Sequence, residues 1–144
     1  MISLKIKNFI ERFYIGIYTL IILFNGYYFL TILEKSVFEW LTTNLCVAAS
    51  LIAIIGFLSK NRTISNTAVP LLLTFGIGGF LLMGWDNFMR IYSQLHHILM
   101  ILNALYILIE SFKAKAIDEM QIGSAIGVIL VLILVDIGSK PVSF

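Results

Sequence analysis

The residues that could do chemistry in this chain are concentrated between Trp85 and Glu110. This stretch contains the only two histidines, His96 and His97, whose side chains titrate near neutral pH. On a helix, at 100° per residue, its polar side chains share one side within an arc of about 200°. The members of this polar stripe are Arg90, Ser93, Gln94, His96, His97, Asn103 and Glu110. Lipid solvates such a stripe poorly, so we expect it to face the interior of a bundle, a cavity or a partner.

Two interpretations of the polar stripe compete. Ionisable groups inside a membrane often mark ion or proton paths, and the two histidines, with Glu110 at one end and Asp86 at the other, would suit a proton relay. Ser, Gln, His and Asn side chains also form hydrogen bonds between helices and hold bundles together. The second interpretation is favoured, because the histidines lie close to a predicted helix end, where water reaches them.

No recognisable catalytic or cofactor motif accompanies these residues. The chain has no Gly-x-Ser-x-Gly, paired-aspartate or phosphate-binding glycine motif and no Ser/His/Asp set. Adjacent residues project about 100° apart on a helix, so His96 and His97 cannot both be axial ligands of one haem. Cys46 is the single cysteine, and no Cys/His spacing typical of a metal site occurs. We therefore expect no enzymatic activity, no catalytic residue, no metal and no cofactor.

Asp86 and Arg90 form a second candidate site. They stand four residues apart in the short turn that precedes the histidine segment. This spacing predicts either a weak ion pair at a helix start or a recognition spot for a partner at the outer surface, and the ion pair is favoured.

Five apolar segments must position these residues. Hydrophobic residues make up 60% of the chain and charged residues 12%, about half the charge of an ordinary globular domain. A bilayer core of roughly 30 Å needs about 20 helical residues. The segments predict helices over 13–33, 38–58, 67–85, 91–109 and 122–137. We expect an all-α polytopic transmembrane helical bundle, a single integral membrane domain over 1–144.

The ends of these helices carry further predictions. Asn66 is placed to be the N-cap of the third helix, with Pro70 in its first turn or just past it. The fifth helix would rise only about 24 Å, so the bundle has four spans if that helix does not cross. The first segment is too long for a signal peptide and lacks a cleavage site, so we expect it to be retained.

Lys and Arg predict the orientation of the bundle. If the N-terminus lies inside, the cytoplasmic side carries seven of these ten residues and the outer side carries three. The inner seven are Lys5, Lys7, Arg12, Lys60, Arg62, Lys113 and Lys115, and the outer three are Lys35, Arg90 and Lys140. We expect a multi-pass protein of the cytoplasmic (inner) membrane with a cytoplasmic N-terminus.

Small residues predict close packing between helices. Gly123 and Gly127 form a G-x-x-x-G pattern. Gly76 and Gly79 leave two positions in the middle of the third predicted helix without a side chain. Without side chains, such positions let backbones approach closely enough for dispersion contacts in lipid. We interpret all four as packing positions, although the glycines over 76–79 could instead break a helix at a substrate site, as in transporters.

This architecture predicts a binding role. The favoured function is lateral helix–helix association, as an accessory subunit or a membrane immunity-type protein that blocks a pore-forming toxin. The alternative is a small oligomeric proton- or ion-coupled transporter or channel that uses the polar stripe. The expected partners are the lipid bilayer and either another membrane protein or a second copy of the chain. A nucleic-acid partner is excluded, since no basic run could follow a phosphate backbone.

Overall fold

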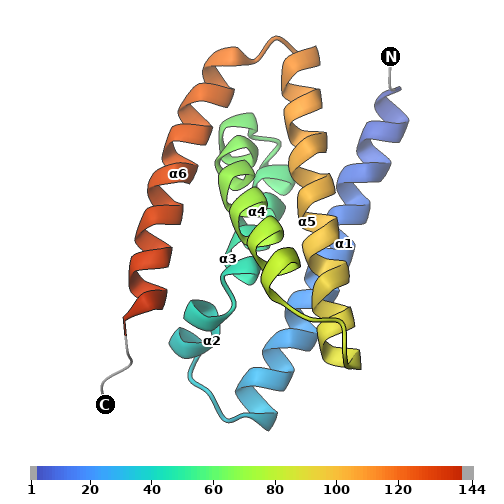
Figure 1. Ribbon diagram of the computed structural model, residues 1–144. Helices are drawn as coiled ribbons and strands as arrows, with labels where there is room; N and C mark the ends of the chain where they lie inside the picture. The colour runs from blue at the N-terminus through green and yellow to red at the C-terminus, as the bar shows by residue number, and fades with distance from the viewer. Residues whose placement is uncertain (1–2, 141–144) are drawn as a thin grey trace.

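The computed structural model describes residues 3–140, which form helices joined by short turns (Figure 1). No strand occurs within this range, so the all-α prediction is confirmed. The elements are α1 (Leu4–Tyr27), its π-helical continuation η1 (Tyr28–Ile32), α2 (Val37–Thr43), α3 (Leu45–Ser59), α4 (Arg62–Leu82), α5 (Phe88–Lys113) and α6 (Ile117–Ser139).

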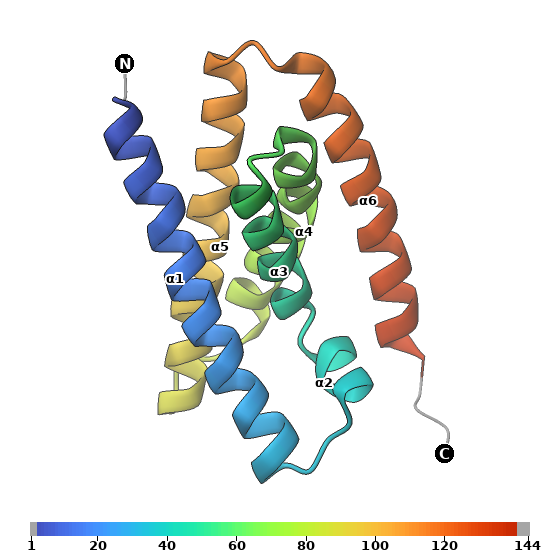
Figure 2. The same cartoon turned by 180° about the vertical axis from the view of Figure 1, so that it is seen from behind.

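Helix α4 lies at the centre of the bundle, where it packs against α3, α5 and α6. Figures 1 and 2 show α3 and α4 between α6 on one side and α1 with α5 on the other. The N-terminus and the α5–α6 turn lie at one end of the molecule, whereas α2, the α4–α5 turn and the C-terminus lie at the other. We call these the N-terminal end and the C-terminal end.

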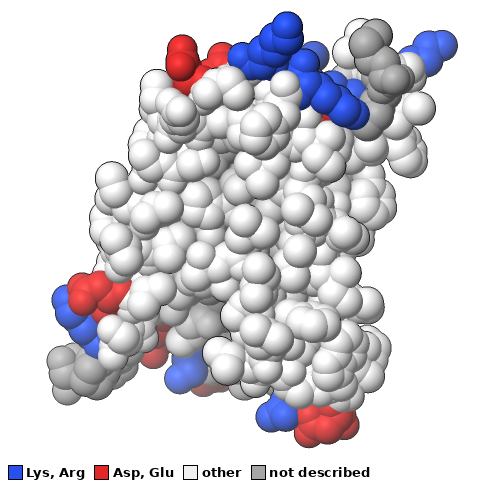
Figure 3. Space-filling view, turned by 45° about the horizontal axis from the view of Figure 1, so that its top comes forward, with Lys and Arg blue, Asp and Glu red and all other residues white. Residues whose placement is uncertain are grey.

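Within residues 3–140, four helices are long and apolar enough to cross a membrane, and α2 with α3 makes a fifth if this bent pair is one span. Figure 3 shows charged side chains gathered at the two ends, with a broad uncharged band between them. These features suggest a membrane location. The predicted shortness of the last helix is wrong, because α6 begins five residues earlier, at Ile117, and rises about 34 Å. Its first turn is polar because it contains Asp118 and Glu119, so a prediction from hydropathy alone leaves this turn out of the helix.

The prediction of one continuous helix over 38–58 is also wrong. The segment divides at Asn44, and the two parts are bent by 93°. Just before the division, the Thr43 hydroxyl donates to the Glu39 carbonyl (2.6 Å) and the Asn44 amide donates to the Trp40 carbonyl (3.0 Å). Such side-chain bonds give the backbone an alternative to continued helix. The polar run over 42–44 therefore ends α2.

Asn25 of α1 fixes this bend in place. Its Oδ1 accepts a hydrogen bond from Trp40 Nε1, and its Nδ2 donates to Asn44 Oδ1 over 3.4 Å. The Trp40 ring lies against Gly26, where an added Cβ would be 3.0 Å from the ring. Asn25 thus bonds to the last turn of α2 and to the residue at which the segment divides.

Besides α6, three helices in the described range begin three or more residues earlier than predicted, and each has its own N-cap. Helix α1 follows Ser3, and α5 follows Asn87. Helix α4 follows Asn61, whose Oδ1 accepts from the Ile64 amide (3.1 Å). The prediction that Asn66 is the N-cap is therefore wrong. Pro70 lies in the interior of α4 rather than near its first turn.

Candidate functional site

Helix α5 turns the middle of the polar stripe into the bundle. Gln94, His96, His97 and Asn103 are buried, and Ser93 is half-buried. The ends of the stripe differ, because Arg90 is exposed at the C-terminal end and the Glu110 side chain is 18% exposed at the N-terminal end. The structure thus brings four of the predicted residues together in the core and places the others at its rims.

His96 joins α5 to α3. Its Nε2 lies 2.9 Å from the Ser50 hydroxyl, which donates its own proton to the Cys46 carbonyl, also over 2.9 Å. Because a hydroxyl has one proton to give, His96 is the donor in this pair. The His96 ring also meets Tyr18 of α1 edge to face, with 5.7 Å between ring centroids. One side chain therefore contacts two neighbouring helices.

Gln94 closes the C-terminal end of α4. Its Nε2 donates to the carbonyls of Phe80 (3.1 Å) and Met83 (2.5 Å), in the last turn of α4 and just after it, where carbonyls lack helical partners. Its Oε1 lies 3.2 Å from Nδ1 of His97, which must donate because a carbonyl oxygen only accepts. The His97 ring fills the space beside Gly79, where any Cβ would collide with it.

Two buried asparagines connect the remaining helices. Asn103 donates to the Tyr18 hydroxyl (3.0 Å), which links α5 to α1. Asn66 donates to the Ser111 hydroxyl (2.9 Å), which links α4 to α5. Sequence reasoning missed Tyr18, Asn66 and Ser111 as core hydrogen-bonding groups. Their partners in these bonds lie on other helices, so only the fold brings each pair together.

Gly123 and Gly127 place α6 directly on the backbone of α4. Both are buried, and an added Cβ at Gly123 would lie 2.5 Å from the Thr63 carbonyl oxygen. A Cβ at Gly127 would lie 2.8 Å from the Pro70 ring. Gly76 likewise faces α5, where a Cβ would be 3.3 Å from the His97 carbonyl. The four glycines singled out in the sequence all lie at contacts between helices of this chain.

A cavity of about 750 Å³ opens beside the histidines at the C-terminal end. Its wall combines apolar side chains with both histidines, Arg90 and the bend at Asn44.

Arg90 Nη1 lies 2.7 Å from Asp86 Oδ1 and so forms the predicted ion pair, which is exposed. A hydrogen bond from its own backbone amide, with a second one from Arg90, lowers the pKa of Asp86.

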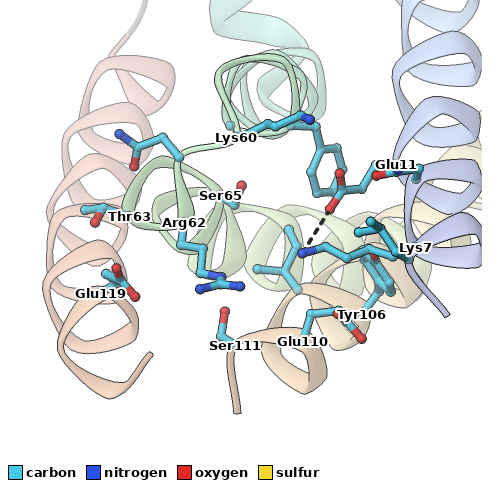
Figure 4. A pocket seen from close by; sticks show the side chains of 16 residues that line it. Lys7, Glu11, Lys60, Arg62, Thr63, Ser65, Tyr106, Glu110, Ser111 and Glu119 are labelled. Carbon is cyan, nitrogen blue, oxygen red and sulfur yellow. Dashed lines mark ion pairs between the residues drawn. The ribbon is translucent and has the colours of Figure 1, made fainter. Parts of the chain in front are cut away.

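A second cavity, of about 590 Å³, lies at the N-terminal end (Figure 4). Its charged lining comes from α1, from the turn between α3 and α4, and from the facing ends of α5 and α6. The charged residues are Lys7, Glu11, Lys60, Arg62, Glu110 and Glu119. Sequence reasoning named only Glu110 as a site residue here. The available signal was the antiparallel topology, which brings the ends of these segments to one side.

Within residues 3–140, no group of three or more His, Cys, Asp or Glu residues could hold a metal ion. The site features described are the hydrogen bonds in the core and a cavity at each end of the bundle. Comparisons with family models, curated proteins and solved structures find no match to this chain.

Proposed function

We propose that this protein is a multi-pass membrane protein that binds another membrane protein, as an accessory subunit or a membrane immunity-type protein. The carrying observation is that every buried residue of the polar stripe forms at least one hydrogen bond inside the chain. His96, His97 and Gln94 each hydrogen-bond to a neighbour within the bundle. Residues committed to such bonds stabilise a scaffold, and a compact scaffold with short turns acts through its surface.

The proposal places the N-terminus in the cytoplasm. Seven of the ten Lys and Arg residues belong to the N-terminal end and three to the C-terminal end. An excess of Lys and Arg in short loops marks the cytoplasmic side of a membrane protein. The Asp86–Arg90 turn then faces outward, where its exposed charges are available to a partner.

Co-purification tests this proposal. The tagged full-length chain is extracted in mild detergent as wild type, as Asp86→Ala with Arg90→Ala, and as Asp136→Ala with Lys140→Ala. The last variant is a matched control, because Asp136 and Lys140 form an exposed pair of the same spacing and length (2.7 Å) at the same end.

We expect one membrane protein to co-purify in constant ratio with the wild type and the control. The Asp86/Arg90 variant should lose at least about 90% of it, a tenfold drop. A chain that purifies alone, or equal recovery from all three proteins, contradicts the proposal.

A transporter is the second candidate, and the cavity beside His96 and His97 favours it. In that case, proteoliposomes that contain the protein carry a pH-dependent flux, and His97→Leu abolishes it. Absence of such a flux, together with a constant partner, supports the binding role over transport.

A further inference from the structure

We propose that the cavity at the N-terminal end binds a phospholipid headgroup with both a phosphate and a primary ammonium, as in phosphatidylethanolamine. The cavity has a volume of about 590 Å³ and lies among the charged residues at one end of the apolar band. If the helices span a membrane as proposed above, this end lies at the level of the lipid headgroups. The inference depends on membrane insertion and not on the identity of a protein partner.

Lys60 and Arg62 provide the site for the phosphate. Neither forms an ion pair with a carboxylate in the described part of the chain. Figure 4 shows the Arg62 guanidinium directed into the cavity toward Ser111, and the Lys7 ammonium of α1 in an ion pair with Glu11 (3.9 Å). A guanidinium presents a planar set of donors that matches two phosphate oxygens, and Lys60 adds a point charge.

Glu110 and Tyr106 of α5 provide the site for the ammonium. Glu110 Oε1 and the Tyr106 hydroxyl are buried, and neither has a hydrogen-bond partner within residues 3–140. The nearest cation, Lys113, holds its Nζ 3.8 Å from Glu110 Oε1, which is too far for a hydrogen bond. A primary ammonium carries three N–H donors and can satisfy both oxygens at once. Figure 4 shows Glu11 on the same side of the cavity.

The charge balance of the cavity favours a zwitterion over a simple anion. Three cations (Lys7, Lys60, Arg62) face three carboxylates (Glu11, Glu110, Glu119), so the formal charge of the lining is zero. A free phosphate or a purely anionic headgroup has no N–H group to donate, so it would leave Glu110 Oε1 and the Tyr106 hydroxyl without a hydrogen-bond partner. A choline headgroup has the right charges, but its quaternary ammonium has no N–H to donate to Glu110 or Tyr106.

Lipid binding to the purified full-length protein tests the inference. Phosphatidylethanolamine, phosphatidylcholine and phosphatidylglycerol with identical acyl chains are added to the protein in detergent, and native mass spectrometry and thermal unfolding report binding. We expect phosphatidylethanolamine to bind about tenfold more tightly than phosphatidylcholine, because charge-assisted hydrogen bonds are lost with choline. Soluble phosphoethanolamine should reproduce the thermal shift at higher concentration, and inorganic phosphate should give a smaller shift.

Equal binding of the ethanolamine and choline lipids would overturn the inference, and so would a preference for phosphatidylglycerol or the absence of any binding. A protein that inserts in membranes and retains its partner but shows no headgroup preference refutes this site alone. A protein that is absent from the membrane fraction refutes the proposed function, and the headgroup site with it, because the site depends on membrane insertion.

Matched variants assign the two halves of the site. Arg62→Gln and Lys60→Gln should weaken all three lipids, whereas Glu110→Gln should remove only the preference for ethanolamine over choline. Lys140→Gln and Asp136→Asn, which form an exposed pair at the opposite end, should change neither property. Lys60 is exposed, so its variant keeps the test informative even where a change at half-buried Glu110 impairs folding.

Discussion

At the scale of single residues, Gln94 forms more side-chain hydrogen bonds than any other residue of the polar stripe within residues 3–140. Its amide nitrogen serves two carbonyls at the end of α4, and its oxygen orients His97. Because the side chain is fully buried, nothing from solvent can replace these bonds. Buried carbonyls that lose their donor destabilise a protein by more than the bond itself contributes.

Replacing Gln94 by Leu should therefore lower the free energy of unfolding by about 2–4 kcal/mol, since two buried carbonyls lose their donor. Thermal or denaturant unfolding in detergent measures the change. Ser93→Ala is the control, because this half-buried neighbour makes no side-chain hydrogen bond within residues 3–140. A small effect of Gln94→Leu, equal to that of the control, would contradict the assigned role.

Two adjacent glycines provide a sharper comparison. A Cβ at Gly79 collides with the His97 ring, whereas a Cβ at Gly78 meets nothing within 4 Å in the described structure. Gly79→Ala should cost about 1–3 kcal/mol through overpacking. Gly78→Ala should be neutral or stabilise by up to about 1 kcal/mol, because alanine favours helix. Similar unfolding temperatures for the two variants would show that His97 does not pack against α4 as described.

At the scale of elements, the contact between α4 and α6 depends on the small residues of α6. Gly123 brings the helix so close that a Cβ would lie 2.5 Å from the Thr63 carbonyl and 2.7 Å from the Asn66 side chain. Only glycine allows this approach without moving one helix, so the G-x-x-x-G pattern is accounted for inside the chain.

Gly123→Ala should therefore destabilise the bundle by about 1–3 kcal/mol. Gly16→Ala is the control, because a Cβ there meets nothing within 4 Å in the described structure. Unfolding in detergent gives both values. If the Gly123 variant is as stable as the Gly16 variant, α6 does not pack on α4 in the manner described.

The helices themselves could be predicted from hydropathy and periodicity, but their ends could not. Hydropathy averages over a window, so it omits polar first turns such as the one at Asn61, although the capping residue is visible in the sequence. It also passes over the polar run before Asn44. That run ends α2 together with a tertiary partner, Asn25, which no local pattern reveals.

The candidate sites were predictable to different degrees. The inward direction of His96, His97 and Asn103 follows from helical spacing, because these positions share one side. Their partners, such as Ser50, could not be predicted, since they lie on other helices. The N-terminal cavity combines residues from Lys7 to Glu119, and only the packing of the helices brings them together.

At the scale of the whole molecule, the two ends are chemically different. The N-terminal end carries seven Lys and Arg residues against four carboxylates, and the C-terminal end carries three against four. The net charges are thus +3 and −1, which sum to the +2 of the chain. This asymmetry is the basis for the proposed orientation, which puts the headgroup site on the inner side and the Asp86–Arg90 turn on the outer side.

The proposed function depends on a topology in which the chain crosses a membrane five times with its N-terminal end in the cytoplasm. Labelling of single cysteines with a membrane-impermeant thiol reagent tests it directly, in a background in which Cys46 is replaced by Ala. Asp86→Cys and Lys140→Cys should react in intact cells, whereas Lys60→Cys and Lys115→Cys should react only after permeabilisation. The reverse pattern would contradict the orientation, and reaction of Lys115→Cys and Lys140→Cys from the same side would contradict the fifth crossing.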